Sequence, residues 1–351
     1  MRVLYFGSYD RDYSRNRVLL KGLRENGVEV IECQDNSPGL RKYIGLFLKY
    51  RRLKTDYDIM LVGFLGHTIM PLARWLNHTR PIVFDAFISL YDSNVYDRRI
   101  LGPHHPRAYC YRLLDRWAMR LADVVLFDTR QHIEYAANFY QLPMKKFRRL
   151  WVGTDDSVFY PRPGRTNEKL RIFFHGSFIP LQGVEVIIHA AKLLEAENVE
   201  FQILGRGQTL AAMVKLAREL APTNIQFIDR RVAYEDLPGY IGAADICLGI
   251  FGKTDKAKRV IPNKVYEYAA CKKPIISSDT PALRELFDEA DIKMIKPSEQ
   301  ALAEAVLELK NDAALRQRLA ENAYNKFTNN ARPILIGAGL IEIFKRDLKH
   351  G

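Results

Sequence analysis

Short runs of apolar residues alternate with stretches of helical periodicity along almost the whole chain. In the first half the apolar runs lie at residues 3–6, 28–32, 59–62, 81–85, 124–127 and 149–152. In the second half they lie at residues 171–175, 200–204, 225–228, 246–250, 274–277 and 292–294. Strands that alternate with helices are typical of parallel sheets, because each crossover between parallel strands needs a helix. The sequence therefore predicts an α/β protein in which this arrangement occurs twice.

The two halves are separated by a short segment that is rich in proline. Residues 161–164 read Pro-Arg-Pro-Gly, which is typical of a linker. A length of 351 residues also favours two domains. We expect one Rossmann-like domain at residues 1–160, a second at 161–333 that faces it across a cleft, and a C-terminal helix at 334–351.

Residues 262–279 carry the most specific chemical signal of the chain. They place Glu267 in a short helix of small residues, followed by a Lys-Lys-Pro turn and a buried strand. Open α/β sheets bind ligands at the carboxyl ends of their strands, where helix N-termini offer unpaired N–H groups. A carboxylate there can accept hydrogen bonds from two sugar hydroxyls, and the nearby Arg259 and Lys264 can contact phosphate. The segment therefore indicates a nucleotide-sugar site.

Further motifs accompany this segment in a definite order. They are Leu-Trp-Val-Gly-Thr-Asp at 150–155 with Phe-Tyr-Pro at 159–161, His-Gly-Ser-Phe at 175–178 with Gln-Gly-Val-Glu at 182–185, Phe-Gln-Ile-Leu-Gly-Arg-Gly at 201–207 and Ala-Ala-Asp-Ile at 243–246. With these motifs the chain resembles the retaining glycosyltransferases of the GT-B fold, family 4, also described as glycosyl transferases group 1. The likeness covers roughly residues 1–350 and is strongest in the second half.

The resemblance implies a retaining transferase that takes its sugar from a nucleoside diphosphate sugar. It implies that Glu267 contacts the ribose of the nucleotide and that a helix near residues 333–349 crosses back to the first domain. It also implies that neither a bound metal nor another resident cofactor is needed. The pair His104 and His105 has no carboxylate or cysteine pattern beside it, so we predict no metal site.

The chain departs from the family pattern at three positions. Arg259 stands where the family often has a second glutamate, and Asn263 and Lys264 are candidates to replace part of its role. Ser177 and Gln182 stand where the family commonly has an arginine and a lysine in its phosphate loop.

Two cations that would neutralise a diphosphate are therefore absent from this loop. The backbone N–H groups of Gly176 and Ser177 can still bind phosphate. Positive charge is expected from the basic loop at residues 252–259, through Lys253, Lys256, Lys258 or Arg259.

Three more donor-site candidates follow predicted strands. Gly205 and Arg206 lie in a Gly-Arg-Gly turn, and Gly7 ends the first strand. Glycine lets the backbone approach a ligand closely, although a tight strand–helix turn would explain these residues equally well.

Two residues of the first half are candidates for the acceptor side and for catalysis. Asp85 ends the predicted strand at 81–85, and His67 lies near the end of the strand before it. Both types of side chain can contact an acceptor hydroxyl at the carboxyl edge of a sheet. The competing interpretation is structural, since an isolated histidine is usually part of a core.

The net charge of +12 narrows the choice of partners, and the basic excess lies mainly in the first half. A basic surface can bind nucleic acid, anionic lipid or a phosphorylated substrate. No nucleic-acid motif accompanies it, so we expect no nucleic-acid partner. Residues 40–54 contain six basic residues among aromatic and aliphatic ones. They are interpreted either as a helix on an anionic membrane surface or as an ordinary surface helix.

Compartment follows from what the sequence lacks. The sequence contains no run of about 18 apolar residues, so we expect no transmembrane helix. The four cysteines are scattered, and residues 1–7 read as a strand and not as a signal peptide. We expect a cytoplasmic protein, peripheral on the inner face of the membrane if it binds lipid.

The sequence thus predicts a hexosyltransferase of polysaccharide biosynthesis with a lipid-linked or growing polysaccharide acceptor. Two alternatives stay open: a nucleotide-sugar epimerase of the same fold, and a GT-B protein that has lost catalysis and only binds a glycan or a partner. The same fold serves many reactions, so the fold alone does not choose among them.

Overall fold

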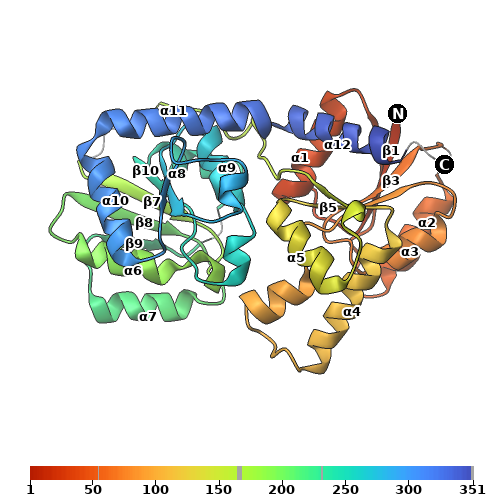
Figure 1. Ribbon diagram of the computed structural model, residues 1–351, viewed down its shortest axis with the longest axis horizontal. Helices are drawn as coiled ribbons and strands as arrows, with labels where there is room; N and C mark the ends of the chain where they lie inside the picture. Colours follow the sequence, from red (N-terminus) through yellow and green to blue (C-terminus); the bar gives the residue numbers. More distant parts are fainter. Residues whose placement is uncertain (54, 164–167, 231, 349–351) are drawn as a thin grey trace. The chain divides into compact units, whose positions relative to one another are not determined.

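The computed structural model in Figure 1 describes residues 1–53, 55–163, 168–230 and 232–348. The chain forms two compact units. Unit 1 comprises Met1–Val95, Arg99–Asp155 and Asn330–Gly351, and unit 2 comprises Tyr96–Arg98 and Asp156–Asn329. The division between the units thus falls at Asp155, whereas we expected it at residue 160.

Unit 1 contains a parallel sheet of six strands in the order β2-β1-β3-β4-β5-β6. The strands are β1 (Arg2–Gly7), β2 (Glu29–Gln34), β3 (Ile59–Val62), β4 (Ile82–Asp85), β5 (Val124–Phe127) and β6 (Phe147–Arg149). The central strands β3, β4 and β5 are buried at every residue. Continuous apolar runs form such strands because helices cover both faces of the sheet.

Helices cover this sheet on both sides. They are α1 (Ser14–Glu25), α2 (Arg41–Arg51), α3 (Met70–Leu76), α4 (Pro106–Leu121), α5 (Arg130–Tyr140) and α12 (Pro333–Asp347), with short helical turns at Asp92–Asp97 and Met144–Lys146. Side chains of α1 and α12 share one core with Val3 of β1. Side chains of α2, α3, α4 and α5 share the other core with Leu4. Neighbouring residues of a strand point to opposite faces, so β1 contributes to both cores.

The helix α12 packs closely against α1, although the two are far apart in the sequence. Gly22 and Gly337 form the contact, and a Cβ atom at either glycine would collide with backbone atoms around the other. Pro333 begins α12, where a missing N–H group is harmless. Residues 330–351 therefore belong to unit 1.

Unit 2 also contains a parallel sheet of six strands, in the order β12-β11-β10-β7-β8-β9. Its first strand, β7, lies between the second and the fourth strands of the unit, whereas β1 of unit 1 lies between the second and the third. Its strands are β7 (Leu170–His175), β8 (Val199–Leu204), β9 (Ile225–Ile228), β10 (Ile246–Leu248), β11 (Ile275–Ser278) and β12 (Lys293–Ile295). Its helices are α6 (Val184–Leu193), α7 (Leu210–Leu220), α8 (Leu237–Gly242), α9 (Asn263–Ala270), α10 (Glu299–Asn311) and α11 (Ala313–Asn330), with short turns of helix at Pro180–Gln182, Asp255–Lys258 and Leu283–Glu285. Two parallel six-stranded sheets confirm the predicted α/β fold class.

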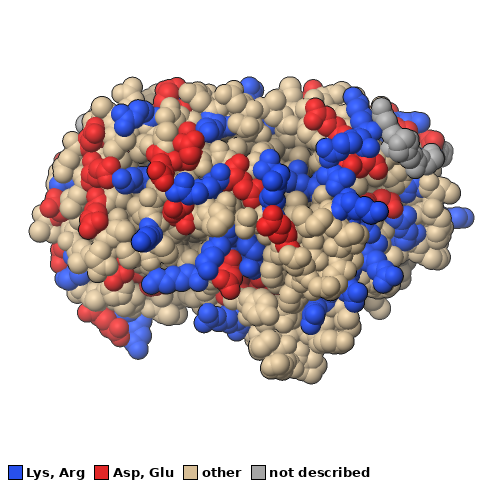
Figure 2. All heavy atoms as spheres, viewed as in Figure 1, with Lys and Arg blue, Asp and Glu red and all other residues tan. Residues whose placement is uncertain are grey.

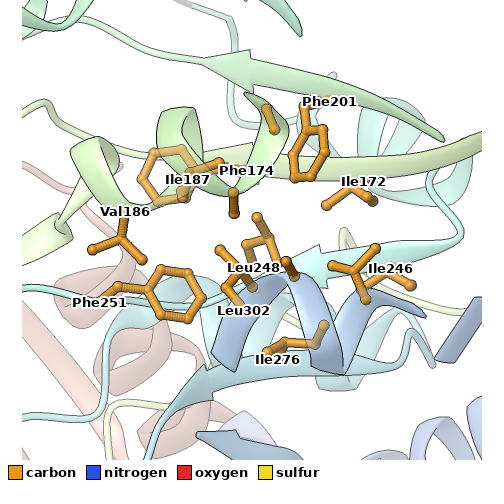
Figure 3. Close-up of a cluster of buried hydrophobic side chains, with 14 of the residues drawn as sticks. Ile172, Phe174, Val186, Ile187, Phe201, Ile246, Leu248, Phe251, Ile276 and Leu302 are labelled. Atoms are coloured by element: carbon orange, nitrogen blue, oxygen red, sulfur yellow. The ribbon is translucent and has the colours of Figure 1, made fainter. Parts of the chain in front are cut away.

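The core of unit 2 fixes the strands that lead to the candidate site. Figure 3 shows Ile172 and Phe174 of β7 beside Leu248 of β10, with Ile187 of α6 and Leu302 of α10 packed around them. Each such side chain contributes about 1.5–3 kcal/mol by leaving water. The loops at the carboxyl ends of β7 and β10 therefore start from rigid positions.

The predicted strand at residues 149–152 was wrong in its bounds, since β6 ends at Arg149. Leu150 still donates its N–H to Phe127 O at 2.8 Å. Beyond it, the carbonyls of Leu150 and Trp151 accept hydrogen bonds from the buried guanidinium of Arg15 at 2.9 and 2.7 Å. A side chain thus takes the place of a strand partner at this edge. The predicted segment at 40–54 forms α2 up to Arg51, and residue 54 lies outside the described residues.

Candidate functional site

The candidate site lies where the strand order of unit 2 reverses direction. The first strand of the unit, β7, has β8 on one side and β10 on the other. Crossovers leave such a point in opposite directions, which opens a crevice outside the carboxyl ends of the two strands. The loop after β7, the loop after β10 and the first turn of α9 meet there.

Two glycines allow the loops after β7 and β8 to pack closely. Gly176 has a φ of +156° and Gly205 a φ of +147°. A Cβ atom on Gly205 would collide with the carbonyl of Gly176, and one on Gly176 would lie 2.8 Å from the Nζ of Lys264. The structure thus brings together three of the predicted donor-site residues. Their glycines are required for a close approach and a positive φ.

Lys264 is the central side chain of the site. It lies in the first turn of α9 and is only 4% exposed. Its Nζ is 2.5 Å from Oε1 of Gln182, 3.5 Å from the carbonyl of Gly249 and 3.6 Å from the centre of the Phe174 ring. Burial lowers the pKa of Lys264 well below its ordinary value, and the negative charge of Glu267 offsets only part of that effect.

This contact accounts for one departure from the family pattern. Gln182 stands where a phosphate-loop lysine is common, and the ammonium of Lys264 lies at the end of the Gln182 side chain. A basic side chain therefore does lie at this loop, but α9 supplies it. Lys264 was a predicted site residue, but its contact with Gln182 could not be predicted, because the two residues are 82 positions apart.

Glu267 lies one turn further along α9, also buried. Its Oε2 is 3.0 Å from Nε2 of His175, the last residue of β7. Neither of these two atoms has an aligned hydrogen-bond partner among the residues that the structure describes. The backbone N–H of His175 donates to the hydroxyl of Tyr268 at 3.2 Å, which fixes the end of β7. His175 belongs to the predicted motif at 175–178, but nothing in that motif assigned it a role.

Two predicted cations are already engaged elsewhere. Arg206 pairs with Asp229 at 2.7 Å, and Lys258 pairs with Asp255 at 3.0 Å, with both pairs exposed to solvent. Ser177 is exposed, whereas Arg259 and Asn263 are partly buried. The buried polar centre of the site therefore consists of side chains from β7, the turn before α6, and α9. In the basic loop Lys256 is also buried, 3.7 Å from Asp97, whereas Lys253 and Lys258 are exposed.

Comparison with known proteins places this unit in a family. Residues 159–326 match the sequence profile of the family described as glycosyl transferases group 1. Most of unit 2 is thus similar to the group 1 glycosyltransferases. The predicted family resemblance is thereby confirmed for this part of the chain.

A curated relative matches a shorter segment. The chain is 32% identical over 99 residues to the putative colanic acid biosynthesis glycosyl transferase WcaI of Escherichia coli K12. The match covers 28% of this chain and 24% of the relative, so the chain spans about a quarter of the length of that protein.

Solved structures share the whole fold at low sequence identity. Sucrose-phosphate synthase from Thermosynechococcus elongatus superposes with a TM-score of 0.75 at 15% identity, covering 99% of both chains. HepE of Anabaena, solved in complex with UDP-glucose, superposes with a TM-score of 0.70 at 14% identity, covering 98% of this chain and 99% of HepE. These likenesses show that both units together have the GT-B fold.

The candidates outside the group 1 domain lie in unit 1, and Asp85 is fully buried there. Its carboxylate pairs with Arg15, from Nη2 to Oδ1 at 2.8 Å and from Nε to both carboxylate oxygens at 3.0–3.1 Å. Both side chains have no exposed surface. This arrangement favours a structural role for Asp85 over the acceptor contact that we predicted.

His67 is also buried, beside the carboxylate of Asp115. Its Nε2 lies 3.0 Å from the carbonyl of Ile88 and 3.6 Å from Oδ1 of Asp115. Burial lowers the pKa of His67, and the nearby Asp115 only partly opposes this effect. A carbonyl only accepts hydrogen bonds, so Nε2 carries the proton of a neutral ring. Gly7, the third candidate of unit 1, is buried at the end of β1 with a φ of +141°.

Proposed function

We propose that this chain is a retaining glycosyltransferase, which moves a hexosyl group from a nucleoside diphosphate sugar to an acceptor hydroxyl. The observation that carries the proposal is the buried ammonium of Lys264 between Gln182 and Gly176. Among the described residues it has no carboxylate within ion-pairing distance. A buried cation without a direct counter-ion is well suited to an anionic ligand.

In this reaction the protein must stabilise the negative charge that develops on the leaving diphosphate. The bond between the anomeric carbon and the diphosphate oxygen breaks, and its electron pair leaves with the diphosphate. The acceptor oxygen forms the new bond on the same face of the sugar, and its proton passes to the leaving diphosphate. Lys264 and the N–H groups of Gly176 and Ser177 would stabilise the charge that develops there. Positioning of the acceptor hydroxyl would contribute the rest of the acceleration.

The ligand-free state of Lys264 supports this assignment. Its lowered pKa means that the protein environment disfavours the charged ammonium. A diphosphate at Gly176 would supply the missing negative charge and raise that pKa again. Nucleotide binding and protonation of Lys264 would therefore favour each other.

Glu267 would bind the ribose. Its buried carboxylate has one oxygen near His175 and no aligned partner for that oxygen among the described residues. Two ribose hydroxyls could satisfy a carboxylate held in this way. His175 would then orient Glu267 and line the same part of the site.

The acceptor proposal rests on relatives and on charge. The similar protein WcaI is described as an enzyme of colanic acid biosynthesis, and we propose a lipid-linked or growing polysaccharide acceptor for this chain. The basic helix α2 would bring unit 1 to an anionic membrane surface. No helix of the described residues could span a membrane. UDP-glucose is the first donor to test, because HepE has been solved with it.

Purified protein should first be titrated with UDP and UDP-glucose by calorimetry. Glu267→Ala should weaken both by roughly tenfold to over a hundredfold, since a lost charged hydrogen bond contributes about 1.5–3 kcal/mol. Glu219→Ala, on the exposed face of α7, is the matched control. Unchanged UDP affinity in Glu267→Ala would contradict the assignment of Glu267 to the nucleotide.

The product then decides between the proposed reaction and the alternatives. Incubation with UDP-glucose and a glycosyl acceptor should release UDP, and NMR should show the donor's anomeric configuration in the product. An epimerised sugar without transfer would indicate an epimerase. Tight nucleotide binding without turnover, tested over a panel of donors and acceptors, would indicate a binding protein.

A further inference from the structure

Helix α4 of unit 1 exposes a stripe of large apolar side chains. Tyr109, Leu113 and Trp117 are 60%, 47% and 52% exposed. They lie four residues apart, so they follow one another along the same side of the helix. Ala108, Ala118 and Met119 on the opposite side are buried against unit 1. The helix is thus apolar on its inner face and again along part of its outer face.

The remaining exposed side chains of α4 are mostly arginines. Arg107, Arg112, Arg116 and Arg120 are exposed beside the apolar stripe. The structure describes every residue of α4, and Asp115, its single acidic residue, is buried. Asp115 accepts hydrogen bonds from Ser89 and Tyr140 inside unit 1, so its charge is not on the surface of α4. The outer face of α4 therefore offers arginine and apolar groups and no acidic group.

Neighbouring helices expose further large apolar side chains. Trp75 of α3 is 59% exposed, and its ring lies 5.8 Å from that of Phe47 on α2. On α2 itself Ile44 and Leu48 are exposed. The helix α3 packs against both α2 and α4, and all three cover the same side of the sheet. In Figure 2 basic and uncharged atoms, and no acidic ones, are visible over the region where Figure 1 places α4.

This combination selects one kind of partner. Large exposed apolar side chains side by side are unusual on a protein that stays in water. Tryptophan and tyrosine suit the interface of a bilayer because their rings are apolar with a polar edge, and arginine pairs with lipid phosphate. In a symmetric dimer through this face the same arginines would oppose one another, since both copies present the same surface.

We propose that the outer face of α4, continued by Trp75 and by α2, binds the surface of an anionic lipid bilayer. Tyr109, Leu113 and Trp117 would enter the region between head groups and acyl chains, and the arginines would contact the phosphates. The proposal extends the membrane part of the proposed function, but it stands on α4, which lies outside residues 40–54. It does not depend on the donor site of unit 2, so the two can fail separately.

Cys110 offers a direct probe of this face. It lies on α4 and is exposed, whereas Cys33, Cys247 and Cys271 are buried. A polarity-sensitive fluorophore on Cys110 should shift to the blue with vesicles of phosphatidylcholine and phosphatidylglycerol. It should shift much less with phosphatidylcholine alone. No shift with either vesicle would overturn the proposal.

Sedimentation of the unlabelled full chain with the same vesicles tests the two components. Leu113→Ser with Trp117→Ser should lower binding at least about tenfold, because less apolar area leaves water. Arg116→Gln with Arg120→Gln should lower it roughly twenty- to thirtyfold, at about fivefold per basic residue. Leu193→Ser on α6, and Lys215→Gln with Arg218→Gln on α7, are the matched controls and should bind like the original protein.

Three results would overturn the proposal even if the protein sediments with lipid. The first is equal binding by the α4 variants and their controls. The second is loss of binding only when Arg41, Lys42 and Arg51 of α2 and the adjacent Arg52 are replaced by glutamine. The third is a concentration-dependent dimer in ultracentrifugation that Trp117→Ser dissociates, which would assign the face to a second copy. Affinity for UDP, measured in the same variants, should stay unchanged and reports separately on the donor site.

Discussion

Each unit buries a basic side chain near the carboxyl edge of its sheet, and the partners of these two side chains differ. Arg15 of unit 1 contacts a carboxylate, whereas Lys264 of unit 2 contacts an amide oxygen. In unit 1 the guanidinium of Arg15 has Asp85 and two backbone carbonyls around it. Burial disfavours its charge, but Asp85 outweighs that effect and keeps the pKa of Arg15 above its ordinary value. In unit 2 the ammonium of Lys264 has an amide oxygen, a more distant carbonyl and an aromatic ring.

The difference separates a structural charge from a binding charge. Arg15 has all the negative charge that it needs within the fold, so it can hold β4 and the chain after β6 together but has little to offer a ligand. Burial of a charged Lys264 costs free energy, and a bound anion would offset that cost. Burial alone would have marked both residues as equal candidates. The partners of each side chain decide between the two roles.

The largest effect is expected when the buried ion pair of Arg15 and Asp85 in unit 1 is broken. Asp85→Ala should lower the free energy of unfolding of unit 1 by about 3–5 kcal/mol, because it leaves a buried guanidinium without its counter-ion. Urea unfolding followed by circular dichroism measures this loss. The double variant Arg15→Met with Asp85→Leu removes both charges and should lose less. A normally stable Asp85→Ala protein that has lost only activity would return Asp85 to the catalytic residues.

Substitution of Lys264 tests whether its side chain binds the diphosphate. Lys264→Met should weaken UDP by roughly tenfold to over a hundredfold and leave the affinity for uridine unchanged, because the lysine would contact only the diphosphate. Calorimetry with both ligands measures the contrast. Lys192→Met on the exposed side of α6 is a control that should bind UDP normally. An equal loss for UDP and uridine would mean that the substitution distorts the whole site.

A second substitution sharpens the same point. In the Lys264→Met background, Gln182→Lys should recover about tenfold of the lost UDP affinity, since it restores a cation where Lys264 now contacts Gln182. In the original protein the same change should destabilise the domain, because it places two ammonium groups together. A folded double variant with no recovery would show that the position of the charge, and not its presence, is what matters.

Stability should depend on pH in a way that distinguishes Lys264 from Arg15. The pKa of Lys264 is lowered in the folded state by burial. Between the folded and the ordinary pKa the unfolded chain binds more protons, so the folded state gains stability as pH rises. Without nucleotide, Lys264→Met should therefore melt higher than the original protein near neutral pH. The gap should narrow as pH rises towards the ordinary pKa of lysine. A gap in melting temperature that is the same from pH 7 to pH 10 would contradict the assigned cause.

The smallest effect is expected in the basic loop. Lys258 is exposed and paired with Asp255, where solvent screens its charge. Lys258→Ala should change UDP affinity by less than about fivefold, and titration at two salt concentrations checks this. A loss as large as that of Lys264→Met would restore the basic loop as the main source of positive charge.

Much of the fold could be predicted because it depends on local pattern. Buried parallel strands need continuous apolar runs. The run at 59–62 coincides with β3, and the run at 246–250 contains β10, which ends at Leu248. The segment at 262–279 formed the helix and strand that its small residues and its Lys-Lys-Pro turn indicated. The end of the edge strand β6 was less predictable, because the residues that follow it, Leu150 and Trp151, give their carbonyls to the side chain of Arg15 from α1.

The sequence by itself determined the fold class, the family of unit 2 and the identity of Glu267 as a candidate, because these depend on periodicity and on motifs in a fixed order. Only the tertiary structure decided what surrounds each charge. In the tertiary structure Lys264 contacts a glutamine 82 positions away, and Asp85 forms an ion pair with Arg15. The apolar stripe of α4 is exposed to solvent. The electrostatic environment of a side chain is set by all atoms within a few ångströms. Most of those atoms come from distant parts of the chain, so no local pattern could reveal them.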